Sequence, residues 1–403
     1  MGSKTRQGEN SWLIKVYKGK NLKTGISEYH RETVKGDEKA AEARIAEVTA
    51  DLHRGEYVSP SKLKFYEYLK NTWLPLSKTE ISEGTYEEYL NVVDNHIQNH
   101  PIGKIPMSRL DLIHIDKYKI DKLNSPRLDG KKDKDGNPIL LSPKTVKNHL
   151  IAIKAACVYA CRLKLIKTNP AQYAEFPKVP KYKAQALDVA QANRFLEVAY
   201  YDRFFFLFIL AIYYSKRKGE LRGLRKQDVD LESMTASVRQ SVRKSGYSSQ
   251  FKDLKSADSE HVLELEPWMI PYFDRESAER AAEKLKYGPG YSDNDLIFAS
   301  LNGNPVKERT LTEHYNKLLD RAGLPRIRFH DLRHTCATIM LKRGWSMKHV
   351  QTRGAWADIK TPAKTYAHIT PDMQKDVNQD LNEAFNINGL TNRIQKGIQK
   401  KAK

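Results

Sequence analysis

The sequence HDLRH, residues 330–334, places two histidines four positions apart, on one face of an expected helix, with an acid directly after the first. Two imidazoles at this spacing beside an acid are one pattern that binds zinc. Arg333, however, carries a permanent positive charge that would repel a metal ion held between His330 and His334. The pattern therefore leaves two interpretations, a zinc site or a clamp for a phosphate.

The charge of the whole chain favours the phosphate. The 403 residues include 69 Lys and Arg against 49 Asp and Glu, a formal net charge of +20. Basic proteins bind nucleic acids because their side chains displace counterions from the phosphates, although a solvated basic surface is the alternative explanation. The three cysteines stand at no metal-ligand spacing and indicate a reducing compartment, with Cys157 and Cys161 expected in a helical core.

No segment predicts a membrane or secreted protein. The longest apolar run, FFFLFILAIYY (residues 204–214), is shorter than the about 20 residues that span a bilayer, so it predicts a buried helix. The first ten residues lack an apolar signal core, and Arg6 stands where a myristoylation motif has Ser or Thr. We therefore expect a cytoplasmic protein.

The N-terminal part, residues 1–58, predicts a small ββ(β)α domain. Two or three short strands are expected within residues 11–34, with Trp12 in their core, followed by a helix over residues 37–55. Lysines on or beside these strands either contact DNA phosphates or form a solvated face. They are Lys15, Lys18, Lys20 and Lys23.

The middle of the chain, residues 62–175, predicts an all-helical domain. A helix begins after Ser82, and the strongest pattern begins with Ser142 as the N-cap and Pro143 at the first helical position. Lys144 and Lys147 in its first turns are candidate DNA-binding residues. Residues 125–140, rich in Gly, Pro and charge, predict a mobile loop or a hairpin, and residues 176–186 a linker.

Residues 187–386 predict a mainly helical domain with a small antiparallel sheet, followed by a basic tail, residues 387–403. Strands are expected at residues 235–242 and 261–266, and the rest is helical. The chain as a whole is therefore an expected α+β multidomain protein. The last helix is amphipathic and either packs on its own domain or docks on a neighbouring protomer; its apolar face comprises Met373, Val377, Leu381, Ala384 and Phe385, with Ile387 just beyond.

Chemically useful side chains lie at four separate places in this third domain. They are Arg217 before a Gly-Glu pair, Lys255 on a hairpin, His330 and Arg333 in HDLRH, and Trp356 and Tyr366 near the end. Each alone is a weak signal, because isolated arginines, lysines and tyrosines are usually surface or packing residues. Their order and spacing together carry the argument.

This order resembles that of the tyrosine recombinase, or phage integrase, family. The family pattern is an Arg in a T-G-x-R-x-G-E turn, a hairpin Lys, H-x-x-R, a His or Trp, and a Tyr about ten residues later. The resemblance covers essentially the whole chain, because the N-terminal and middle domains resemble the arm-binding and core-binding domains of mobile-element integrases. It implies a site-specific DNA recombinase of a phage or integrative element.

The sequence departs from the family pattern at three places. Tyr214 and Ser215 replace the Thr-Gly before the first arginine, and Gly354-Ala355-Trp356 replaces Leu-Gly-His. Trp356 is interpreted as a packing and hydrogen-bonding substitute, since its indole N–H is a donor. The hairpin lysine aligns best as Lys255, but Lys252 lies on the same hairpin.

The resemblance also implies roles for these residues. Tyr366 attacks phosphorus to give a 3′-phosphotyrosyl intermediate, Arg217 and Arg333 stabilise the developing charge, and Lys255 protonates the leaving 5′-oxygen. His330 binds the phosphate and assists proton transfer from Tyr366. Glu220 orients the first arginine, and His334 is assigned a structural role. No metal is expected, because the two arginines stabilise the charge on the phosphate. No cofactor is expected, because the phosphotyrosyl bond conserves the energy needed for rejoining.

The implied partners are double-stranded DNA attachment sites and three further copies of the chain in a tetramer on DNA. An excisionase and a host DNA-bending protein are additional candidates. Two alternatives remain open: a type IB topoisomerase-like strand transferase, which has similar chemistry, and a zinc hydrolase built on HDxxH, for which no clear third ligand is present. The arm-like N-terminal domain favours an integrase over the topoisomerase.

Overall fold

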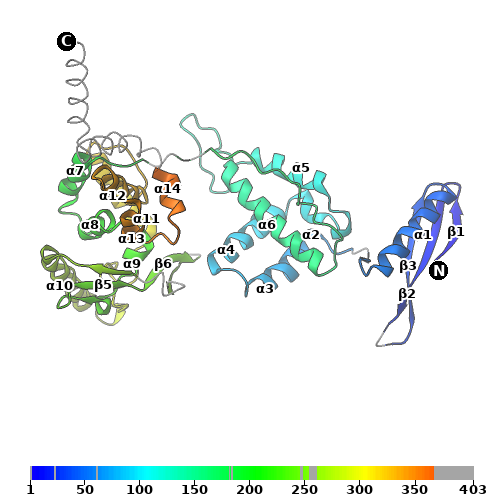
Figure 1. Cartoon of the computed structure of the whole chain (residues 1–403), viewed down its shortest axis with the longest axis horizontal. Coiled ribbons are helices and arrows are strands. Elements are labelled where there is room, and N and C mark those ends of the chain that lie inside the picture. Colours follow the sequence, from blue (N-terminus) through cyan, green and yellow to red (C-terminus); the bar gives the residue numbers. More distant parts are fainter. Residues whose placement is uncertain are drawn as a thin grey trace, which may run out of the picture. The chain divides into compact units, whose positions relative to one another are not determined.

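The computed structural model describes residues 2–21, 24–59, 62–180, 182, 185–245, 248–253 and 261–366. It comprises two compact units, Met1–Lys181 and Tyr182–Lys403, and the division falls within the expected linker (Figure 1). The expected amphipathic C-terminal helix and the basic tail lie outside the described residues. Among the residues that are described, no helix is long and apolar enough to cross a membrane.

A three-stranded antiparallel sheet with one helix across it opens the first unit (Figure 1). Its elements are β1 (Gly2–Gly8), β2 (Ser11–Lys20), β3 (Ser27–Lys35) and α1 (Glu38–His53). Alternation along β2 turns Ile14 and Val16 into the interior, where both are buried. Trp12, expected in this core, is only half-buried: it shares the face of Ile14 but stands next to the start of the strand, where the cover is incomplete.

The rest of the first unit is a helical bundle around one apolar core. Its helices are α2 (Phe65–Tyr68), α3 (Leu74–Ser77), α4 (Glu83–Val92), α5 (Leu112–Leu123) and α6 (Pro143–Arg162), with π-helical turns at Leu69–Trp73 and Val93–Ile97. The side chains of Ser82 and Ser142 cap α4 and α6, as the sequence predicts. Residues 125–140 form a hairpin closed by antiparallel bridges, Pro126 with Leu140 and Lys132 with Pro138.

The described residues of the second unit are mainly helical and include two small antiparallel sheets. Its helices are α7 (Val189–Ala199), α8 (Phe205–Tyr213), α9 (Lys218–Arg222), α10 (Ile270–Tyr287), α11 (Glu308–Arg321), α12 (Asp331–Lys342), α13 (Met347–Gly354) and α14 (Lys360–Tyr366). One sheet pairs β4 (Val229–Asp230), β5 (Thr235–Val238) and β8 (His261–Glu264); the other pairs β6 (Gln240–Ser245) with β7 (Ser248–Asp253). The single strand expected at residues 235–242 is thus two strands broken at Arg239, because β5 and β6 pair with different partners.

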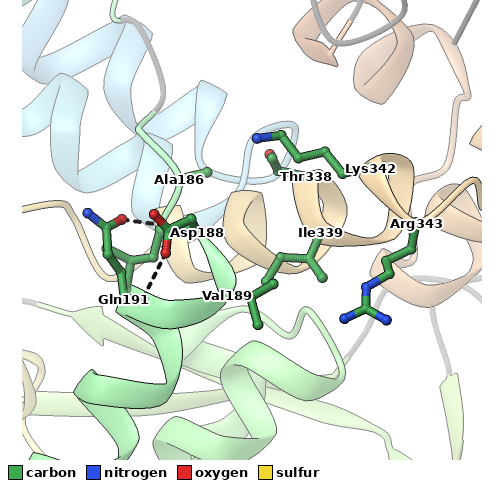
Figure 2. A pocket seen from close by; sticks show the side chains of 9 residues that line it. Ala186, Asp188, Val189, Gln191, Thr338, Ile339, Lys342 and Arg343 are labelled. Carbon is green, nitrogen blue, oxygen red and sulfur yellow. Dashed lines mark hydrogen bonds between the residues drawn. The ribbon is translucent and has the colours of Figure 1, made fainter. Parts of the chain in front are cut away.

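Helix α12, which begins within HDLRH, is held by the start of the second unit. The backbone N–H of Leu187 donates to Oγ1 of the buried Thr335 at 3.0 Å. Asp188 then caps α7 through reciprocal bonds with Gln191 (Figure 2). A small pocket of about 240 Å³ separates the start of α7 from Thr338 and Ile339 on α12. This packing holds the face of α12 that carries Thr335 and Ile339 against the start of α7.

Candidate active site

Arg333 on α12 is a buried cation that offers a hydrogen-bond donor. Only 1% of the residue is exposed. Its Nη1 donates to the carbonyl oxygen of Ser215 at 2.7 Å, and its guanidinium stacks 3.8 Å from the ring centroid of Trp356. Nη2 is buried and has no hydrogen-bond partner among the described residues. Burial, and then the charge of Arg217, lowers the pKa of Arg333 to about 10, so it remains charged at neutral pH.

The turn that carries Arg217 is fixed against the β6–β7 hairpin. Arg217 precedes α9, and its backbone N–H and Nη1 donate to the carboxylate of the buried Glu220 at 2.9 and 2.7 Å. A Cβ on Gly219 would lie 2.5 Å from Oγ of Ser241 and 2.8 Å from the carbonyl oxygen of Val242. Only glycine permits this contact, so the first arginine and the root of the hairpin keep one relative position.

A third cation, which the sequence analysis did not single out, lies beside this turn. Lys216 is 3% exposed. Burial lowers its pKa to about 8, with Glu220 opposing the shift and Arg333 adding to it. Three basic side chains, those of Lys216, Arg217 and Arg333, thus lie near the single carboxylate of Glu220. The region therefore keeps a net positive charge and suits an anion.

The hairpin lysine stays open between two positions. Lys255 lies outside the described residues. Lys252 belongs to β7, opposite Ser241 on β6, which places its backbone on the hairpin whose root touches Gly219. The assignment of a general acid to Lys255 therefore remains a prediction.

The hydroxyl of Tyr366 contacts a different histidine from the expected one. Tyr366 ends α14 and is 2% exposed, and its Oη lies 2.6 Å from Nδ1 of His334. The ring of His330 packs edge-on against that of His334, with 5.3 Å between centroids. His330 precedes the first turn of α12 and is exposed, whereas His334 lies one turn further in, where α14 reaches it. The sequence predicts a structural role for His334, and the structure adds a direct contact between His334 and the Tyr366 hydroxyl.

The pKa shifts of this group follow mainly from burial. Burial lowers the pKa of His334, while the nearby Asp331 raises it, so the imidazole is neutral at neutral pH. Partial burial lowers the pKa of His330, and the charges of His334 and Arg333 lower it further. Solvent at the exposed edge of the ring screens part of this effect. Burial raises the pKa of Tyr366. The phenol is therefore protonated and needs a base to become a nucleophile.

Two departures from the family pattern fall on residues with a left-handed backbone. Ser215 and Ala355, which replace two glycines, have φ of +56° and +54°, the left-handed region that glycine adopts most readily. A Cβ on Gly354 would lie 1.9 Å from Cζ3 of Trp356, so the indole occupies the space of the missing Leu side chain. The changes at Gly354 and Trp356 are therefore coupled.

The candidate DNA-binding lysines have varied surroundings. The Nζ of Lys15 lies 4.1 Å from the ring centroid of Tyr29, and that of Lys147 lies 5.4 Å from Phe176. Lys18 forms an ion pair with Glu28 at 3.6 Å. Lys20 and Lys144 are exposed, whereas Lys23 lies outside the described residues. Their contact with DNA remains a prediction.

Comparison with known proteins places these features in a family. The model of the phage integrase family matches residues 185–373. A tyrosine recombinase XerC-like protein of Caldanaerobacter subterraneus subsp. tengcongensis is 25% identical over 402 residues, covering 94% of this chain and 98% of that protein. The integrase of Staphylococcus phage L54a is 25% identical over 169 residues, 41% of this chain and 48% of that protein.

Solved structures share the fold at lower identity. The Tn1549 transposon integrase in complex with a circular intermediate DNA has a TM-score of 0.61 and 17% identity, covering 79% of this chain and 99% of that one. A lambda integrase tetramer bound to a Holliday junction has a TM-score of 0.53 and 13% identity, covering 90% and 94%. The family match thus falls on residues 185–373, and over almost its whole length the chain is similar to a tyrosine recombinase.

Proposed function

We propose that this chain is a tyrosine recombinase that cuts and rejoins DNA at specific attachment sites, and so integrates or excises a phage or an integrative element. The observation that carries the proposal is the buried Arg333, whose Nη2 lacks a partner among the described residues, in the same cluster as the Tyr366 hydroxyl. A buried guanidinium is costly unless an anion pairs with it. A DNA phosphodiester supplies that anion, and Tyr366 supplies the nucleophile.

The chemistry needs only side chains of this chain. Arg217 and Arg333 bind the non-bridging oxygens and stabilise the charge that develops there. Tyr366 attacks phosphorus, leaving a 3′-phosphotyrosyl bond and a 5′-oxygen that takes a proton from the hairpin lysine, Lys255 or Lys252. Because the new bond keeps the phosphodiester energy, the reverse attack by a 5′-hydroxyl rejoins DNA without a cofactor.

The proposed partners are DNA attachment sites and further copies of the chain. Four strand cuts per recombination imply a tetramer, and the lambda integrase neighbour was solved as a tetramer bound to a Holliday junction. Sedimentation of the complex on DNA measures this; a complex that stays at two protomers would contradict it. An excisionase and a host DNA-bending protein are further proposed partners, and the bacterial cytoplasm, where the DNA lies, is the proposed location.

The direct test is a covalent adduct. The full chain is incubated with supercoiled DNA that carries candidate attachment sites, and the mixture is denatured before electrophoresis. A DNA fragment that migrates with attached protein until it is digested with protease is the expected result. Cleavage that leaves no attached protein, or that stops when a chelator is added, would point instead to a metal-dependent hydrolase.

Removing residues 1–58 tests the proposed arm-binding domain. This domain would add a second DNA contact and raise the apparent affinity through effective concentration. All proposed catalytic residues lie beyond residue 187, so the truncated chain should still form adducts on a short substrate that covers only the crossover site. It should fail to integrate a plasmid bearing the full attachment region. Equal integration by both chains would show that the domain does not bind arm sites.

A further inference from the structure

The Tyr366 hydroxyl lies against the second histidine of HDLRH. The distance of 2.6 Å between Oη and Nδ1 of His334 is within the reach that a general base needs in the resting state. We propose that His334 is the general base that takes the proton from Tyr366 as the phenol oxygen attacks phosphorus. This inference rests on the proposed function, in which Tyr366 is the nucleophile.

Asp331 lies on the far side of the same imidazole. It is fully buried, and its Oδ1 is 4.0 Å from Nε2 of His334. Arg328 Nη2 and Tyr182 Oη donate to the carboxylate at 2.9 and 2.6 Å and so fix its position. The order of carboxylate, imidazole and hydroxyl is the arrangement that activates nucleophiles in other enzymes. Asp331 is a positioning residue whose negative charge favours the imidazolium that forms on proton transfer.

The proposed step balances. The proton moves from Oη of Tyr366 to Nδ1 of His334 while the bond from Oη to phosphorus forms. The bond from phosphorus to the 5′-oxygen breaks, and that oxygen takes a different proton from the hairpin lysine. On rejoining, the 5′-hydroxyl gives its proton back to the hairpin lysine as it attacks phosphorus. The bond from phosphorus to Oη of Tyr366 breaks, and His334 returns its proton to that oxygen.

The surroundings of His334 decide whether it can act as a base at neutral pH. The titratable and charged groups that face it are Asp331 and Arg333 on α12, Arg328 before that helix, His330 at its start and Tyr366 on α14. Burial and the two arginines lower the pKa of His334 below 6.5 despite Asp331. The free base is therefore fully present at neutral pH and is lost as the pH falls through that lowered pKa.

The test is the pH dependence of adduct formation, measured over roughly pH 5 to 9 with a suicide substrate. The wild-type rate should fall at acid pH and level off near neutrality. His334→Gln keeps a side chain that can hydrogen-bond Tyr366 but cannot accept the proton. Its rate should be about a hundredfold lower at neutral pH and should rise about tenfold per pH unit, because attack then depends on the scarce phenolate. A purely structural loss would lower the rate equally at every pH.

His314→Gln is the matched control. His314 on α11 also faces a carboxylate, Asp202, at 2.8 Å, but it lies outside the proposed site, so this variant should keep the wild-type rate and profile. Asp331→Asn should move the acid limb to lower pH, because removing the negative charge lowers the pKa of His334. DNA binding and melting curves of each variant show that it is folded.

The outcomes separate the two proposals. If Tyr366→Phe still forms the adduct, the nucleophile assignment fails. If that variant is inactive but His334→Gln keeps a profile parallel to the wild type, only the role of His334 is overturned. Should His334→Gln melt early, His334→Ala with added imidazole replaces it: restored adduct formation supports the base, and no restoration overturns it.

Discussion

Replacing Arg333 with methionine should slow DNA cleavage by at least about a hundredfold without lowering the melting temperature. The guanidinium is 1% exposed, and among the described residues its Nη2 lacks a partner, so the resting protein bears the cost of a buried charge. Methionine fills most of the volume and removes that cost, whereas the phosphate loses its buried donor. Single-turnover cleavage and a thermal melt measure the two effects.

Arg280→Met is the matched control for this substitution. Arg280 on α10 is also buried, at 3% exposure, but it forms ion pairs with Glu279 and Glu283. Removing it takes away one of the two arginines that pair with each carboxylate and leaves only Arg275 on Glu279 and Arg203 on Glu283 among the described residues. The melting temperature should therefore fall while the cleavage rate of the folded protein stays unchanged. If Arg333→Met cleaves at a normal rate, or melts as early as Arg280→Met, Arg333 is a structural residue.

The start of several elements was predictable because the signal is local. A serine followed by proline, as at Ser142 and Pro143, satisfies the free N–H groups of a first turn whatever packs around it, and α6 begins there. Strand β1 has no such signal. Its sequence is polar and mostly exposed, and it becomes a strand because it pairs with β2 across a short turn.

Within the site, the sequence predicts which groups are present but not which of them touch. Helical spacing places His330 and His334 on one face, yet the position of α14 decides which imidazole meets Tyr366, and that depends on packing 32 residues along the chain. The residue types also do not predict the positive φ of Ser215 and Ala355, because neither serine nor alanine favours that conformation. The family pattern has glycine at both positions, and that glycine is the sequence signal for the positive φ.

Tyr366→Phe should abolish the covalent adduct while leaving specific DNA binding intact. The substitution removes one oxygen from a side chain that is 2% exposed, so the shape of the site stays the same. His334 loses one hydrogen-bond partner, which costs about 1 kcal/mol and shifts the melting temperature by a few degrees at most. In the proposed mechanism Tyr366 is the nucleophile, so no adduct should form without its oxygen. Denaturing electrophoresis of the protein–DNA mixture measures the adduct.

Tyr315→Phe provides the comparison for this experiment. Tyr315 on α11 is fully buried in the same unit, and its hydroxyl has no partner among the described residues, so its loss should leave adduct formation unchanged and stability equal or higher. In the wild-type adduct, the modified tryptic peptide should be residues 365–375, which contains Tyr366 and no other tyrosine. An adduct that survives in Tyr366→Phe, or that maps to another peptide, would assign the nucleophile to a different side chain. The contact between His334 and Tyr366 would then be structural, because the imidazole would have no reacting proton to take.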